Sequence, residues 1–215
     1  DSIVGGKTVY TYRKNLGQEL AKENNFDADV IIPVPDSGVP AALGYSQESK
    51  KPFELGIIRN HYVGRTFIEP SQSIRQFGVK LKHNANSSYI ENKKVILIDD
   101  SIVRGTTAKK IIKMVYDAGA KEVHLGIACP PIKHPDFYGI DTPDYNELIA
   151  AKSSLEEINN IIGSKSIFFL SLEGTYKAMG YEKRDNETPQ FTDHCFTGDY
   201  PTSLLDREQG TVSKQ

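Results

Sequence analysis

The sequence contains no tryptophan and only two cysteines, Cys129 and Cys195. Two cysteines cannot build a disulfide framework, and a reducing cytoplasm is the simpler setting for them. No stretch approaches the roughly 20 consecutive apolar residues that a membrane span needs. The longest apolar runs, residues 95–98 and 167–172, have the length of strands. We therefore expect a cytoplasmic protein without a membrane partner.

A large excess of charge of either sign is also missing. The formal net charge is −2 over 215 residues. Without a basic surface, nucleic acid is not an expected partner, and any anionic ligand must be held by a local site. This length suits one large domain, or one domain with a substantial appendage. Because the chain starts at Asp1 and not at Met, we expect it to be a fragment of a longer protein.

The periodicity of apolar residues predicts an α/β fold. We expect helices over residues 10–24, 39–48 and 106–118, and strands over residues 29–34, 53–58, 95–98 and 122–128. The strand–helix–strand order from 95 to 128 implies a right-handed parallel crossover, and hence a mostly parallel sheet flanked by helices.

Two further segments complete the predicted organisation. Residues 60–88 show no sustained period and are predicted to form a long, flexible loop. Short elements are predicted over residues 147–151, 155–162, 167–172 and 175–180, before a polar, extended tail from Lys183. We therefore predict a core over residues 1–145 and a smaller C-terminal α/β extension, residues 146–215, packed on it.

Candidate binding chemistry follows directly after the strand predicted over residues 95–98. Asp99 and Asp100 would lie at the carboxyl edge of the sheet, where open α/β folds bind ligands. Residues 101–107 bring small and hydroxylated residues around Gly105, and then a helix starts. Their N–H groups can hold an anion, and Thr106 and Thr107 can cap the helix and donate to phosphate. A ribose phosphate needs such a carboxylate pair beside such a cradle; the alternative is a solvated Asp-Asp turn and an ordinary helix cap.

Residues 95–107 resemble the signature for phosphoribosyl pyrophosphate (PRPP) in type I phosphoribosyltransferases, in the form found in the amidophosphoribosyltransferase family. Other motifs fall in that family's order and spacing: residues 34–38, 62–68, 135–141, 147–150 and 196–198. The resemblance covers residues 9–205. It implies a type I phosphoribosyltransferase fold and the opening step of purine biosynthesis, in which ammonia displaces pyrophosphate from C1 of PRPP and gives 5-phosphoribosylamine.

The resemblance also implies roles for individual residues. Arg65, Lys82, Asp99 and Asp100 match catalytic positions, and Ser37, Asp99 and Asp100 match positions around Mg²⁺. The substrate-binding positions match Pro35, Asp36, Ser37 and Gly38 on the pyrophosphate side, and Ser101, Val103, Arg104, Gly105, Thr106 and Thr107 on the phosphate side. Arg65 and Lys82 would fold over PRPP from the long loop; the alternative for Lys82 is a solvated basic run.

The chain departs from the family pattern in two respects. The nucleophilic cysteine that leads the glutaminase half is absent, so we expect activity with ammonia only, with the glutaminase domain as a partner in the full-length protein. Some members carry an iron–sulfur cluster on four cysteines; Asp136 and Thr192 stand at two of those positions, and Cys195 alone cannot hold a cluster. We therefore predict no cluster.

A few readings stay open at this point. A zinc site from Cys129, His134, His194 and Cys195 has no recognised spacing and is disfavoured. The resemblance further implies a homo-oligomer and purine nucleotides as feedback inhibitors. Alternative functions are a phosphoribosyltransferase of base salvage, a non-catalytic PRPP or nucleotide sensor, or a truncated domain that binds PRPP without turnover. The sequence assigns no role to His61 or His83.

Overall fold

The structure is a computed structural model that describes residues 2–60, 83–140, 142 and 144–204. Its centre is a parallel sheet of four strands in the order β3-β6-β7-β8. These are β3 (Val30–Pro33), β6 (Lys94–Asp99), β7 (Glu122–Ile127) and β8 (Ser166–Phe169). Parallel sheets are buried on both faces, so their strands read as continuous apolar runs. All of β3 and the middle of β6 are buried in this way.

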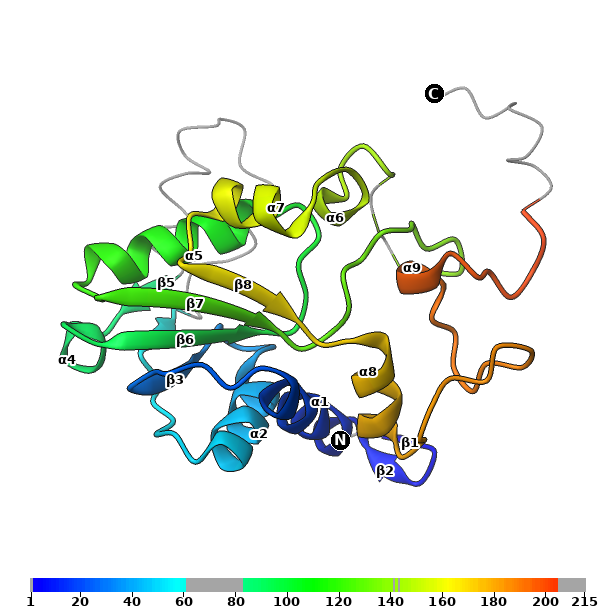
Figure 1. The fold of residues 1–215 in the computed structure, drawn as a ribbon, viewed down its shortest axis with the longest axis horizontal. Helices are drawn as coiled ribbons and strands as arrows, with labels where there is room; N and C mark the ends of the chain where they lie inside the picture. The colour runs from blue at the N-terminus through cyan, green and yellow to red at the C-terminus, as the bar shows by residue number, and fades with distance from the viewer. Residues whose placement is uncertain (1, 61–82, 141, 143, 205–215) are drawn as a thin grey trace.

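Helices cover both faces of this sheet (Figure 1). On one face lie α5 (Thr106–Asp117) and α7 (Leu155–Ile162); on the other lie α1 (Val9–Glu23) and α2 (Val39–Ser49), with α8 (Leu172–Met179) packed against α1. Val95 and Leu97 of β6 pack into the first layer, whereas Ile96 and Ile98 pack into the second. Successive side chains of a strand point to opposite faces, so one strand contributes to both cores. The predicted α/β fold is confirmed.

Two short antiparallel pairs accompany the main sheet. They join β1 (Ile3–Val4) to β2 (Lys7–Thr8), and β4 (Ile57–Arg59) to β5 (His83–Ala85). The strand predicted over residues 53–58 is therefore wrong in its bounds. Phe53 forms an isolated bridge to Ile31, and the regular strand starts at Ile57.

The predicted loop over residues 60–88 is also wrong at its described end. Residues 83–85 form β5, and the short helix α4 (Ser87–Ile90) follows. The sequence of β5 is His-Asn-Ala, which has no apolar alternation, so its pairing with β4 makes it a strand. Residues 61–82 lie outside the described residues.

The C-terminal part adds both helices and a strand. α6 (Ile149–Lys152) and α7 precede β8, which is the fourth strand of the main sheet, and α9 (His194–Thr197) is the last helix described. The predicted extension therefore shares the sheet of the core, and the division at residue 145 stays a prediction. Among the helices described, none has the length and apolar character needed to cross a membrane.

Candidate active site

The carboxyl ends of β3 and β6 meet at one edge of the sheet because these strands are parallel neighbours. The N–H of Val34 donates to the carbonyl of Ile98 at 2.8 Å, which continues the pairing past the end of β3. The turn of residues 34–38 therefore starts beside Asp99. A Cβ at Gly38 would overlap the Ile98 carbonyl oxygen and lie 3.2 Å from the Cα of Asp99. Glycine allows the turn to approach the end of β6 this closely.

A pocket of about 390 Å³ opens at this edge. The predicted site residues that line it are Pro35, Ser37, Asp99, Asp100, Ser101, Val103, Arg104, Gly105, Thr106 and Thr107. Asp36 and Gly38 do not line it, although they flank residues that do. Arg65 and Lys82 lie outside the described residues. The fold thus brings both predicted halves of the site around one cavity.

The carboxylate pair in this pocket places two acidic side chains directly next to each other. The backbone N–H of Asp100 donates to Asp99 Oδ1 at 2.9 Å, and the Ser101 hydroxyl donates to Asp100 Oδ1 at 3.3 Å. Burial, followed by the charge of Asp100, raises the pKa of Asp99 well above the usual range of a carboxyl group. A cation opposite the pair would offset this cost, and oxygen ligands of this kind suit Mg²⁺.

The loop after the carboxylates leads into the N-terminus of α5. Gly105 is the N-cap residue, with φ of 76°, and no side chain caps the helix. The predicted capping by Thr106 and Thr107 is therefore wrong: they are the first two residues of the helix, and both are exposed. The first N–H groups of a helix have no carbonyl partner within it. Together with the helix dipole they make this end of the pocket suited to a phosphate group.

Hydrogen bonds from the segment around α6 hold the loop between Asp100 and α5 in place. The N–H of Ile149 donates to the carbonyl of Val103 at 2.9 Å. Nε and Nη2 of Arg104 both donate to Glu147 Oε2, at 2.8 and 2.6 Å. Arg104 lines the pocket while its guanidinium is held by Glu147, so its predicted contact with phosphate would require sharing or exchanging this partner.

The family model for the phosphoribosyl transferase domain matches residues 10–152 of the chain. The chain belongs to the phosphoribosyltransferase domain family. The match spans all the residues that line the pocket, from the turn after β3 to the start of α5.

The relatives of this phosphoribosyltransferase domain given below are amidophosphoribosyltransferases, and each is more than twice as long as the matched part. The amidophosphoribosyltransferase of Rhizobium etli is 63% identical over 96% of the chain, and that of Bacillus subtilis is 50% identical over 95%. A solved structure of the Bacillus subtilis glutamine PRPP amidotransferase, complexed with ADP and GMP, superimposes with a TM-score of 0.86 and covers 95% of the chain. The chain spans 42%, 43% and 45% of these proteins, respectively.

Two pocket residues of the phosphoribosyltransferase domain were missed from the sequence. Arg59 and His83 are opposite one another in the β4–β5 pair, and both line the pocket. Arg59 Nη1 lies 2.5 Å from Asp36 Oδ2, while its buried Nε has no partner among the described residues. The signal was local: Arg59 ends an apolar run, but the predicted strand stopped one residue short of it. Asp36 therefore contributes to the pocket through Arg59.

The four residues considered as a zinc site, Cys129, His134, His194 and Cys195, do not form one cluster of ligand atoms among the described residues. Cys129 lies near Asp99 and Asp100, and burial followed by their charges raises its pKa far above the usual range of a thiol. His134 Nδ1 lies 3.1 Å from the hydroxyl of Tyr145. A different group comes together: the ligand atoms of Asp136, His194 and Cys195.

Proposed function

We propose that the chain is the phosphoribosyl-transferring part of an amidophosphoribosyltransferase. Ammonia, supplied from glutamine by the full-length protein, would displace pyrophosphate from C1 of PRPP and give 5-phosphoribosylamine. The observation that carries this proposal is the single pocket that holds Asp99 and Asp100 beside the N-terminus of α5 and the turn after β3. The names of the relatives, at 63% and 50% identity, support the same reaction.

Binding would divide among the three parts of the pocket. The first N–H groups of α5 and the hydroxyls of Thr106 and Thr107 would hold the 5-phosphate of PRPP. Asp99 and Asp100 would accept from the ribose hydroxyls. Mg²⁺, when bound, would neutralise charge on the pyrophosphate, with Ser37, Asp99 and Asp100 as its oxygen ligands, partly through water.

The transfer itself rests on positioning and charge. Positive charge develops at C1 as its bond to pyrophosphate breaks, so the protein needs to hold the leaving group and exclude water. In the turn of residues 35–38, Asp36 and Ser37 would present their N–H groups to pyrophosphate, since Pro35 has none and that of Gly38 donates to the Val34 carbonyl. Arg59 adds a cation to this wall of the pocket. Arg65 and Lys82 would close over PRPP from residues outside the described part of the chain.

Partners of the whole protein are proposed on the same basis. A relative binds ADP and GMP, and these nucleotides share a ribose phosphate with PRPP, so we propose purine nucleotides as feedback inhibitors. The glutaminase domain as a partner, a homo-oligomer and a cytoplasmic location complete the proposal.

The proposed reaction is tested by offering the chain different acceptors for the phosphoribosyl group. The chain is incubated with PRPP and Mg²⁺. In separate reactions it is then given ammonium, adenine, guanine, hypoxanthine or orotate, and pyrophosphate release is measured in each. We expect release with ammonium alone. Release that depends on a free base would instead assign the chain to base salvage, and PRPP binding without any turnover would favour a sensor or an inactive domain.

Glutamine should not replace ammonium with this chain. Both thiols are poor nucleophiles because burial raises the pKa of Cys195 and of Cys129, with nearby carboxylates adding to each effect. We expect no glutamate to form from glutamine, measured with a coupled glutamate assay, under conditions in which ammonium gives turnover. Glutamate formation that is lost in Cys129→Ser or Cys195→Ser would contradict this.

A further inference from the structure

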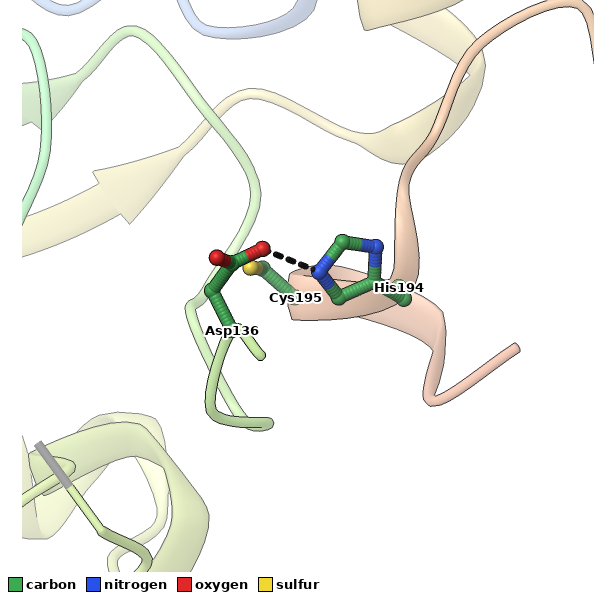
Figure 2. Close-up of side chains that lie close together, drawn as sticks. All are labelled: Asp136, His194 and Cys195. Atoms are coloured by element: carbon green, nitrogen blue, oxygen red, sulfur yellow. Dashed lines mark hydrogen bonds and ion pairs between the residues drawn. The ribbon is translucent and has the colours of Figure 1, made fainter. Parts of the chain in front are cut away.

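Three metal-ligating side chains from distant parts of the chain converge outside the active site. Asp136 lies on the segment that follows β7, and His194 and Cys195 are the first two residues of α9. Their ligand atoms all lie within 4.8 Å of one another, and Figure 2 shows the imidazole and the thiol beside the carboxylate. Asp136 and His194 are buried, and Cys195 is half-buried.

The backbone holds these two segments together without help from the three side chains. The N–H groups of Lys133 and His134 donate to the carbonyl of Cys195, at 2.9 and 3.1 Å. At the start of α9, the N-cap residue Asp193 is bound by Arg184, whose Nε lies 2.6 Å from its Oδ2. The ligand groups are therefore brought to one place by preformed structure, which lowers the entropy cost of binding an ion.

The carboxylate is oriented as a ligand. Oδ2 of Asp136 accepts the N–H groups of Tyr138 and Ile140, at 2.9 and 2.7 Å, which leaves Oδ1 directed at His194. The direction of the Asp136 carboxylate is therefore fixed by backbone donors, and hydrogen bonds of this kind orient metal ligands in general.

His194 is incompletely satisfied in this arrangement. Nε2 lies 2.6 Å from Asp136 Oδ1, whereas the buried Nδ1 has no hydrogen-bond partner in the described part of the chain. The rings of Tyr138 and Tyr200 lie 5.2 and 5.1 Å from the imidazole. Nε2 is the nitrogen that faces the carboxylate, and the proton in the Nε2–Oδ1 contact lies where a cation could bind.

We propose that Asp136, His194 and Cys195 form a site for one divalent transition-metal ion of the zinc class, with water as a further ligand. Imidazole nitrogen, thiolate sulfur and carboxylate oxygen are the ligands that Zn²⁺ takes, and three of them suffice when water fills the fourth position. Mg²⁺ and Ca²⁺ prefer oxygen ligands only. One thiolate is too few for an iron–sulfur cluster.

Binding requires a small rearrangement with a defined proton balance. Metal bonds of about 2.0–2.1 Å place two tetrahedral ligands roughly 3.3 Å apart, so Nε2 and Oδ1 separate by less than 1 Å from their present 2.6 Å. The thiol proton of Cys195 is released to solvent, and the proton on Nε2 of a neutral His194 moves to Nδ1. The ion would then fasten α9 to the segment between β7 and α6, and α6 packs against the phosphate loop.

Cobalt spectroscopy tests this site. The chain is freed of metal with a chelator, and Co²⁺ is added in excess Mg²⁺, which occupies the oxygen ligands of Asp99 and Asp100. We expect one equivalent of Co²⁺ to give a thiolate-to-cobalt charge-transfer band and tetrahedral d–d bands, to raise Tm, and to be displaced by Zn²⁺. Cys195→Ser should remove the charge-transfer band, and Asp136→Asn should weaken binding at least about tenfold.

The other cysteine provides the matched control. Cys129→Ser should leave the charge-transfer band unchanged, since Cys129 lies beside Asp99 and Asp100. Asp136→Asn keeps an oxygen that accepts from Tyr138 and Ile140, so it should preserve the local fold and report on ligation alone. The proposal is overturned if the wild-type chain shows no thiolate band, or if the band survives Cys195→Ser and disappears in Cys129→Ser.

Discussion

Replacing Asp99 with Asn is expected to lower the rate of phosphoribosyl transfer by at least about 100-fold, and to make the Mg²⁺-free protein more stable at pH 8. The loss of activity follows from its proposed place beside the ribose hydroxyls and Mg²⁺, where removal of one charged contact costs several kcal/mol. The gain of stability follows first from the burial of the Asp99 carboxylate and then from its repulsion by Asp100.

The sign of the pH dependence is fixed by the direction of the pKa shift. The pKa of Asp99 is higher in the folded protein than in the unfolded chain, so the folded state binds its proton more tightly. Ionisation of Asp99 therefore destabilises the folded protein progressively as pH rises from about 4, the pKa of a free carboxyl group, toward the folded pKa. Below that range Asp and Asn should be nearly equivalent; at pH 8 the variant should be more stable by roughly 1–2 kcal/mol.

Thermal unfolding at pH 4 and pH 8, with and without Mg²⁺, measures this effect. Mg²⁺ should raise the Tm of the wild-type chain at pH 8 and leave that of Asp99→Asn unchanged. The matched control is Asp117→Asn at the end of α5, whose exposed pair with Lys113 is worth less than about 0.5 kcal/mol. A variant that is less stable than the wild type at pH 8 would show that hydrogen bonds to Asp99 outweigh the repulsion.

Replacing Gly105 with Ala is expected to lower kcat/KM for PRPP by roughly tenfold to 100-fold. The N-cap position has φ of 76°, which side chains with a Cβ adopt at a cost of about 1–2 kcal/mol. The new Cβ would also meet Ile149 Cδ1 at 2.9 Å. If the backbone shifts to relieve either the unfavourable φ or the contact with Ile149, the first N–H groups of α5 turn away from the proposed 5-phosphate. Loss of one such donor has effects of this size.

Gly163→Ala is the matched control for the backbone. Gly163 ends α7 with φ of 83°, and a Cβ there meets nothing within 4 Å. In denaturant unfolding Gly163→Ala should lose only the backbone cost and Gly105→Ala should lose more because of the contact with Ile149, while only Gly105→Ala should raise the KM for PRPP. Equal kinetics for the two variants would show that the N-terminus of α5 does not bind the phosphate.

The central half of the site could be read from the sequence because it is contiguous. A buried strand, two carboxylates, a glycine-containing loop and a helix follow one another over residues 95–107, and local rules for strands and helix ends place them in that order. The error at Thr106 and Thr107 shows the limit of those rules. Gly105 takes the N-cap position itself, so Thr106 and Thr107 fall inside the helix, and Ile149, far along the chain, packs against the loop.

The opposite wall of the pocket could not be read in this way. Arg59 and His83 come together through the pairing of β4 with β5, whose sequences carry little strand pattern of their own. The same holds for Asp136 and His194, which are 58 residues apart and meet through contacts between two irregular segments. Such contacts depend on packing between distant parts of the chain, which periodicity does not report.

The sequence by itself determined the α/β class, the places of β3, β6 and β7 along the chain, and the segment that carries the carboxylate pair and the phosphate loop, because each depends on residues that are neighbours in sequence. Only the tertiary structure decided that β8 completes the sheet, that Asp36 is paired with Arg59, and that Asp136, His194 and Cys195 share one place. Those arrangements arise when apolar faces are buried together, and the free energy of that burial depends on the whole chain and not on any local pattern.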